Sequence, residues 1–200
     1  TYVRLNAQHV RVHAMTRLGC ALRENDQSEL ALAVLQAQLP ILQRLGPRYF
    51  GNTLIAKTNI ANCLDDLGRI EEALSMKREV YQDDLRLYGP TKEGTLVDVC
   101  NLAVSLLSLG RHDEAARIIS RHVGPAQKKL GADHDLVLRL QHFLAISSAR
   151  TATSRKEKME ALSSMQAVYE RRLRVFGATH PQTKNCEEAV ARIRELLGDM

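Results

Sequence analysis

The chain has 200 residues, of which 44% are hydrophobic and 4% aromatic, with no tryptophan. A core of leucine, alanine, valine and isoleucine favours helix over sheet. The 28 basic and 23 acidic residues give a net charge of +5 and are spread along the chain, which biases partners toward acidic ones without identifying them. No apolar run reaches the roughly 18 residues of a membrane-spanning helix, so no such helix is predicted.

Two helices are expected at the N-terminus, at about residues 2–24 and 28–45. They form a degenerate first copy of the 42-residue repeat that follows. In this copy, Gly19 and Ala31 occupy the positions that Ala61 and Ala73 have in the next repeat. Ser28 is expected to cap the second helix, because a serine hydroxyl can accept a hydrogen bond from the first free backbone N–H groups.

The repeating unit is clearest in residues 59–73 and 101–115. Three anchors recur at the same offset without a gap: Asn-(Ile/Leu)-Ala at 59–61 and 101–103, Gly-Arg at 68–69 and 110–111, and Glu-Ala at 72–73 and 114–115. A fixed period of this size indicates a repeat protein.

Each unit is predicted to be a helix, a tight turn and a second helix. Apolar residues recur at helical spacing up to Leu67, the Gly-Arg pair interrupts them, and a second apolar series begins at Ala73. Small residues such as Ala61 and Ala73 allow two antiparallel helices to approach closely. Gly68 and Gly110 suit the left-handed conformation that ends a helix.

The second and third repeats are expected at about 53–89 and 95–131, each second helix ending at a glycine, as the first does at Gly46. Two second helices contain a proline in the same register, Pro40 and Pro125. A kink is expected at each, sharper at Pro125 because a glycine precedes it.

The fourth repeat, at about 136–177, departs from the period by four residues. The polar segment 151–156 replaces the usual turn, and we expect it to form an inserted surface loop, either as tolerated variation or as a contact site. A last helix, at about 180–197, is interpreted as a cap or as half of a further repeat.

Two further segments close repeats: Leu-Gly-Ala-Asp-His at 130–134 and Phe-Gly-Ala-Thr-His-Pro at 176–181. Together with the three anchors, they resemble the 42-residue tetratricopeptide (TPR) repeats of kinesin light chains and related proteins. The resemblance covers roughly residues 13–198. It implies an all-α, right-handed α-solenoid of antiparallel helix pairs, with about four repeats and a C-terminal capping helix. We expect one domain over residues 1–200, with repeats at about 2–46, 53–89, 95–131 and 136–177 and a cap at about 180–197.

No catalytic, cofactor-binding or metal-binding set is predicted. His9 and His13 share a helix face, but the glutamate of a metalloprotease motif and a spaced third ligand are missing. His134 and His180 occupy the closing turn, where in the resembling family the residue helps to set the next helix. The four cysteines, at 20, 63, 100 and 186, form no CxxC pair and are interpreted as small buried residues in a reducing compartment.

The resemblance places a concave binding groove on the first helix of each pair. The predicted groove positions are Thr16, Cys20, Arg23, Glu24, Thr58, Asn62, Asp65, Asp66, Cys100, Val104, Leu107 and Ser108. In TPR proteins an asparagine at the place of Asn62 often holds a peptide backbone or a terminal carboxylate. The lysine and arginine that complete a carboxylate clamp are absent at the equivalent positions, and two aspartates add negative charge.

Asn59 and Asn101 also belong to the kinesin-light-chain-like pattern, in which this asparagine lies toward the groove. A buried, helix-stabilising role explains them equally well.

The predicted function is a non-catalytic protein–protein interaction scaffold or adaptor that binds a partner segment in its groove. The alternative is a constitutive structural subunit of a large assembly, and a more distant one is an RNA-binding helical repeat that uses basic clusters at 128–129, 155–158 and 171–174. No small-molecule substrate is expected. The chain begins at Thr1, so we expect a fragment or a mature segment, in a reducing intracellular compartment such as the cytoplasm.

Overall fold

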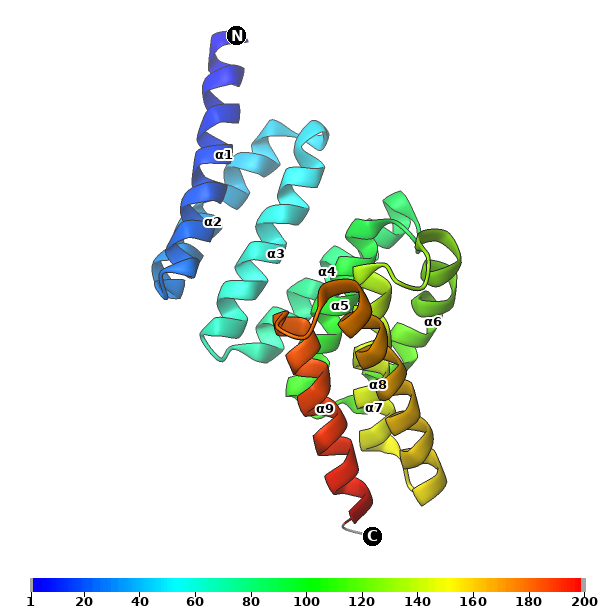
Figure 1. Ribbon diagram of the computed structural model, residues 1–200. Coiled ribbons are helices and arrows are strands. Elements are labelled where there is room, and N and C mark those ends of the chain that lie inside the picture. The colour runs from blue at the N-terminus through cyan, green and yellow to red at the C-terminus, as the bar shows by residue number, and fades with distance from the viewer. Residues whose placement is uncertain (1, 199–200) are drawn as a thin grey trace. The chain divides into compact units, whose positions relative to one another are not determined.

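The computed structural model describes residues 2–198, with side chains described from Ala7 onward. This part of the chain contains nine α-helices, one short 3-10 helix and no strand (Figure 1). The elements are α1 (Tyr2–Glu24), α2 (Ser28–Leu45), the 3-10 helix η1 (Pro47–Tyr49), α3 (Phe50–Asp66), α4 (Ile70–Tyr88), α5 (Glu93–Ser108), α6 (His112–Leu130), α7 (Asp135–Thr151), α8 (Arg155–Phe176) and α9 (Pro181–Gly198). The predicted all-α fold of successive helix pairs is confirmed.

The chain divides into two compact units, Thr1–Gln82 and Asp83–Met200, and α4 begins in the first and ends in the second. In the first unit, α2 packs against both α1 and α3, and α1 also contacts α3. In the second, each helix from α5 to α9 packs against the next, and α7 also contacts α5 and α9. The single domain over residues 1–200 stays a prediction.

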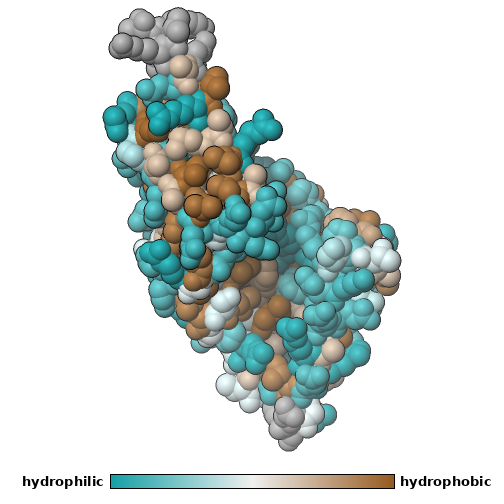
Figure 2. All heavy atoms as spheres, turned by 90° about the vertical axis from the view of Figure 1, so that its left-hand side faces the viewer, coloured by the Kyte–Doolittle hydropathy of each residue, from teal (hydrophilic) through white to brown (hydrophobic). Residues whose placement is uncertain are grey.

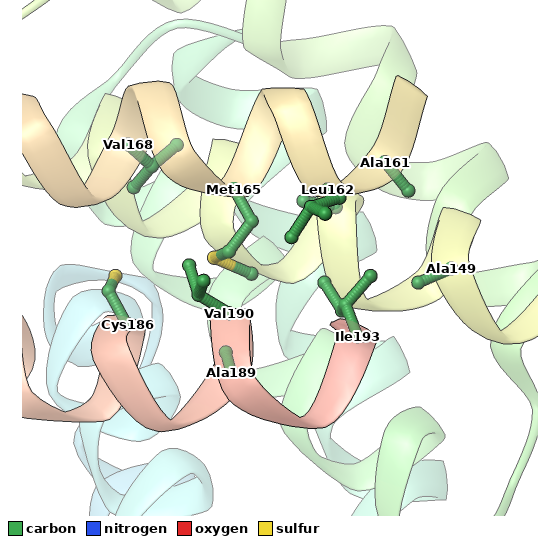
Figure 3. Close-up of a cluster of buried hydrophobic side chains, with 10 residues drawn as sticks. Ala149, Ala161, Leu162, Met165, Val168, Cys186, Ala189, Val190 and Ile193 are labelled. Atoms are coloured by element: carbon green, nitrogen blue, oxygen red, sulfur yellow. The ribbon is translucent and has the colours of Figure 1, made fainter. Parts of the chain in front are cut away.

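Each unit has a core of leucine, alanine and other aliphatic side chains, as the composition predicted. In the first unit, a buried cluster joins α2, α3 and the start of α4 through residues such as Leu35, Ile60 and Ala73. In the second, α9 lies against α8, and Figure 3 shows Met165 and Val190 facing one another between the two helices. The C-terminal helix is therefore part of the core of the second unit.

The Gly-Arg anchor closes the first helix of each of the two clearest repeats in the same way. Gly68 has φ 74° and Gly110 has φ 69°, the left-handed region that a glycine enters without steric cost. The backbone N–H of Arg69 then donates back to the carbonyl of Leu64 at 2.8 Å, and the N–H of Arg111 makes the equivalent bond at 2.8 Å. This bond reverses the chain into the second helix.

The arginine and glutamate of the anchors also pair with each other. Arg69 contacts Glu72 at 2.6 Å, and Arg111 contacts Glu114 at 2.6 Å, each between residues three apart. Each arginine lies just before the second helix and each glutamate lies in its first turn, where a carboxylate also complements the helix dipole. The two residues of the Glu-Ala anchor therefore have different roles: the glutamate forms a surface ion pair, and the alanine is buried in the core.

The cap predicted at Ser28 is wrong. Ser28 is the first residue of α2, and the capping position belongs to Gln27, whose side chain makes no capping hydrogen bond. A serine cap occurs instead at Ser154, whose hydroxyl accepts from the N–H of Glu157 at 3.2 Å while the Glu157 carboxylate accepts from the N–H of Ser154 at 3.1 Å. This reciprocal pair is a capping box.

The inserted loop predicted at 151–156 is also wrong. The α7–α8 connection is the three residues 152–154, as short as the α5–α6 connection at 109–111. Instead, α7 has 17 residues where α5 has 16, and α8 has 22 where α6 has 19. The four additional residues therefore lie in the helices and not in a loop, because the capping box at Ser154 stabilises a helix that begins at Arg155.

The two histidines of the closing turns start the following helices, as predicted. Nδ1 of His134 accepts from the N–H of Leu136 at 3.3 Å, and Nδ1 of His180 accepts from the N–H of Gln182 at 3.3 Å. Both bonds satisfy a backbone donor that has no partner within its own helix.

Both predicted proline positions lie inside helices. α2 continues past Pro40, and α6 continues past Pro125. The kinks expected at these residues stay predictions.

Gly19 shows how tightly the first helix pair is packed. A Cβ atom built on this glycine would lie 2.6 Å from Cγ of Leu35, which is fully buried in the core of the first unit. By contrast, a Cβ built on Gly51, in α3, would meet nothing within 4 Å. The glycine in the first repeat therefore lets α1 approach α2 more closely than an alanine would.

Gly19→Ala should destabilise the protein although alanine is the better helix former, because overpacking a core costs about 1–3 kcal/mol. Gly51→Ala, the control, should be neutral or stabilising by up to about 1 kcal/mol. Urea unfolding followed by circular dichroism compares the two variants. Equal stability of both variants would show that α1 and α2 are not in close contact at Gly19.

Candidate peptide-binding surface

The first unit brings seven of the predicted groove residues onto two neighbouring helices. They are Thr16 and Arg23 on α1, and Thr58, Asn59, Asn62, Asp65 and Asp66 on α3. Six of the seven are half-buried and Asp66 is exposed. Because α1 contacts α3, these residues border one surface of the first unit, which we call the α1–α3 surface.

The charges of the α1–α3 surface are paired within the unit. Nε of Arg23 donates to Asp66 at 2.8 Å, so that an ion pair joins α1 to α3, and the hydroxyl of Ser28 donates to the same carboxylate at 3.4 Å. The buried ammonium of Lys77 donates to Asp65. The two aspartates therefore add much less negative field to this surface than the sequence suggested.

The two threonines are engaged with the scaffold. Thr16 donates to the carbonyl of Val12 at 3.2 Å and accepts from Nε2 of Gln38, a fully buried amide on α2, at 2.7 Å. Thr58 donates to the carbonyl of Leu54 at 3.0 Å. Thr16 is thus part of the contact between α1 and α2, since a buried amide needs partners of this kind.

Asn59 and Asn62 differ from their neighbours. Both side chains are half-buried on α3, and neither forms a side-chain hydrogen bond with any residue in the described part of the chain. A side-chain amide offers two donors and an acceptor, the set that pairs with a peptide backbone. These two amides are therefore the groups of the α1–α3 surface that can take up a new ligand.

In the second unit, the predicted groove residues lie on α5. Val104 and Ser108 are exposed and Asn101 is half-buried. Cys100, expected on the groove by the same spacing, is fully buried, and burial raises the pKa of its thiol to about 11. Cys100 is therefore an inert core residue.

A pair of carboxyl groups, buried Asp98 and half-buried Asp84, lies at the junction of α4 and α5 and was missed by the sequence reasoning. Asp98 is only 6% exposed, and its burial together with the neighbouring carboxyl group of Asp84 raises the pKa of Asp98 to about 8. Its equivalents 42 residues away are the buried Ala56 and Leu140. The sequence did contain a sign of this pair, because Asp98 is acidic where the equivalent residues of the other repeats are apolar.

A second polar junction joins α7, α8 and α9. Nδ1 of His142 lies 3.1 Å from Sγ of Cys186, and the buried guanidinium of Arg172 donates to the carbonyl of Gln182 at 3.0 Å. Burial lowers the pKa of His142 to about 4 and raises the pKa of the Cys186 thiol. The pair is thus a neutral imidazole and a thiol enclosed in the core, the opposite of an accessible thiolate nucleophile.

The other histidines do not assemble into a metal site. The rings of His9 and His13 lie edge to face with centroids 4.4 Å apart. Among residues 7–198, no three histidine, cysteine or acidic side chains come together in a way that could hold a metal ion.

The C-terminal basic clusters do not form one continuous cationic stripe. Arg172 is buried, Arg174 pairs with Asp133 at 3.4 Å, and Lys158 donates to the carbonyl of Leu196 at 2.8 Å. These cations are held by the protein itself, which removes much of the support for an RNA-binding role.

Comparisons with known proteins agree with the repeat pattern. Residues 52–123 match the tetratricopeptide repeat family. This segment therefore consists of tetratricopeptide repeats. No curated protein matches its sequence.

Solved structures with a similar fold include kinesin-light-chain-like repeats. A point variant of nearly identical TPR-like repeats, from a Podosopora anserina protein assigned as a kinesin light chain, has a TM-score of 0.77 and 19% identity over 94% of this chain and 87% of that one. A second crystal structure of those repeats gives a TM-score of 0.75, with 19% identity over 94% and 88%. BtubC (BKLC) from P. vanneervenii gives 0.62, with 12% identity over 98% and 91%.

Tetratricopeptide folds generally mediate protein–protein interactions and are typically non-catalytic, so protein partners are implied. No helix within residues 2–198 has the length and apolar character needed to cross a membrane.

Asp98→Asn should stabilise the protein more at pH 8 than at pH 5. In the unfolded chain this carboxyl ionises near its ordinary pKa of 3.8, whereas in the folded protein its pKa is about 8. Stability contributed by the protonated group is complete below pH 3.8 and is lost as the pH rises toward 8, by at most about 1.4 kcal/mol per pH unit. Urea unfolding of both proteins across this range measures the difference, and a difference independent of pH would contradict the buried pair.

Proposed function

We propose that this chain is a non-catalytic scaffold or adaptor that binds an extended or helical segment of a protein partner along the first helices of its repeats. In the first unit the contact centres on Asn62, with Asn59 one turn away on α3. The observation that supports this choice best is that these two half-buried amides have no partner in the described part of the chain, while the residues around them do.

The surroundings of Asn62 favour recognition of a peptide backbone over capture of a terminal carboxylate. Lys77 is bound to Asp65, and Arg23 is bound to Asp66, so neither cation is available as a carboxylate clamp. An amide that both donates and accepts matches the alternating N–H and C=O groups of a peptide. Partner side chains, and not a free chain end, would then set specificity.

The α1–α3 surface is also prepared before binding. The Arg23–Asp66 pair joins the two helices, and Gln38 on α2 bonds both Thr16 and the carbonyl of Val12, the latter at 2.8 Å. The ion pair is substantially exposed and by itself contributes little stability. The ion pair instead fixes the two side chains before binding. A surface whose side chains are already ordered loses less conformational entropy when a partner binds, so the affinity is higher.

A constitutive subunit of a large assembly is the second candidate, and the outer face of α1 favours it. Val10 is 65% and Leu18 is 50% exposed, and the alanines between and after them, Ala14 and Ala21, are exposed as well. Figure 2, which faces this side of the first unit, shows apolar patches among the polar side chains. The outer face of a terminal repeat is usually polar when it is exposed to solvent. Apolar residues on this face are therefore consistent with a contact to another protein.

Affinity capture from the native extract at low and moderate salt, followed by mass spectrometry, separates the two candidates. For the adaptor, we expect several substoichiometric proteins that share a short segment, and Asn62→Ala should lose them without losing helicity. Gln36→Ala, at an exposed position of α2, is the control and should retain them.

A single partner set of fixed stoichiometry, resistant to salt and indifferent to Asn62→Ala, would overturn the adaptor and support the subunit. Replacing Leu18 by serine should then disrupt that set.

A further inference from the structure

The second unit contains a groove that none of the residues predicted on the first helices line, although residues 151–153 of the predicted loop segment do. Its volume is about 820 Å³, and its lining residues place α7 at its floor and α6 and α8 at its walls. Both wall helices pack on α7, without comparable packing on each other. A volume of this size lies within the range of ligand-binding clefts in proteins.

The groove exists because the fourth repeat replaces large core residues with smaller or polar ones. Val99 and Leu106 on α5 are fully buried, whereas their equivalents 42 residues later on α7 are Gln141 and Ser148, both half-buried. The side chain of Ser148 has two heavy atoms fewer than the leucine of the third repeat. The floor is therefore lower and more polar than the repeat pattern requires.

The walls are made of small residues too. On α8, Ala161, Ser164 and Ala167 line the groove, and on α6 the wall includes Gly124. A Cβ built on Gly124 would meet nothing within 4 Å, so this glycine faces open space. Glycine inside a helix costs about 1 kcal/mol relative to alanine, and no packing contact requires it here.

The two ends of the groove differ in charge. Asp113, Glu157 and Glu160 lie where α6 and α8 begin, and Arg171 lies toward the other end. The N–H groups of Thr153 and Ser154 donate to Glu157 and lower the pKa of its carboxyl, which keeps it ionised. Glu157 lies at this end because α8 begins at Arg155, with only three residues between it and the end of α7.

Within residues 7–198, no ion pair shorter than 4.0 Å neutralises the negative charge of this end. Lys156 approaches Glu160 only to 4.0 Å, and both side chains are largely exposed, so the pair is weak. The carboxylates can therefore attract a cationic group that enters the groove.

We propose that this groove binds a segment of a protein partner that presents small and aliphatic side chains to α7 and ends in lysine or arginine at the acidic end. The small walls and lowered floor accept the segment, the polar edges of Gln127 and Gln141 can bond its backbone, and the carboxylates select its basic end. This site is independent of Asn62 and gives the protein a second contact surface.

The test selects 12-residue peptides from a phage-displayed library on the full chain and measures the affinities of the enriched peptides. We expect peptides with lysine or arginine at one end, whose affinity falls as salt increases. Ser148→Leu, which restores the residue of the third repeat and fills the floor, should weaken them at least tenfold. Glu160→Lys, at an exposed position where folding is not at risk, should weaken them several-fold.

Ser163→Leu, on an exposed face of α8 outside the groove, is the matched control and should leave the affinity unchanged. The proposal is overturned if no peptide is enriched, if the enriched peptides lack basic residues, or if they bind Ser148→Leu and Glu160→Lys as tightly as the wild type. Peptides lost only on Asn62→Ala would assign binding to the α1–α3 surface and likewise overturn this site.

Discussion

The close contact between the two helices of each pair is the constraint on which the rest of this structure depends. It is made by residues with little or no side chain at one register: Gly19, Ala61, Ala103 and Ala145 on the first helices, and Ala31, Ala73, Ala115 and Ala161 on the second. All eight are buried. Because the backbones approach so closely there, leucines and isoleucines on either side can interdigitate, and the turn between the helices must be short.

Away from this contact the repeats differ, and the differences carry the chemistry. One register at the junction between successive pairs holds Ala56, Asp98 and Leu140. The aspartate is tolerated because the preceding helix supplies Asp84 and the pair retains a proton, and at α8–α9 Arg172 and Cys186 show that other polar pairs are accepted. The groove on α7 follows the same principle, since a residue that fills the third repeat is reduced in the fourth. A repeat scaffold can thus gain binding surfaces without changing its backbone.

The sequence predicted the fold well because the period, the small residues and the closing glycines are local signals that agree with one another. The helix bounds, the left-handed Gly68 and Gly110, and the helix-starting roles of His134 and His180 all follow from them. Prediction failed where two local solutions compete. Ser28 could have capped α2, and the polar segment at 151–156 could have formed a loop, but a capping box at Ser154 made helix the better use of the extra residues.

The candidate site was harder to predict because side-chain partners come from residues distant in the chain. Asp66 is bound by Arg23, 43 residues away, and Thr16 by Gln38, 22 residues away. Such pairs decide which polar groups on a surface remain available. Comparing residues in the same register would have revealed Asp98 and Ser148 as exceptions to an apolar pattern, so part of that information was present in the sequence.

The most direct measurement is the free energy of unfolding of Ala103→Leu, determined in urea beside Ala191→Leu at an exposed position of α9. Three additional side-chain carbon atoms are introduced in both variants, but only at Ala103 do they enter the helix contact. A loss of about 1–3 kcal/mol at Ala103 with little change at Ala191 is the expected result. Equal stability of the two variants would contradict the role assigned to the small residues, and with it the packing that positions both binding surfaces.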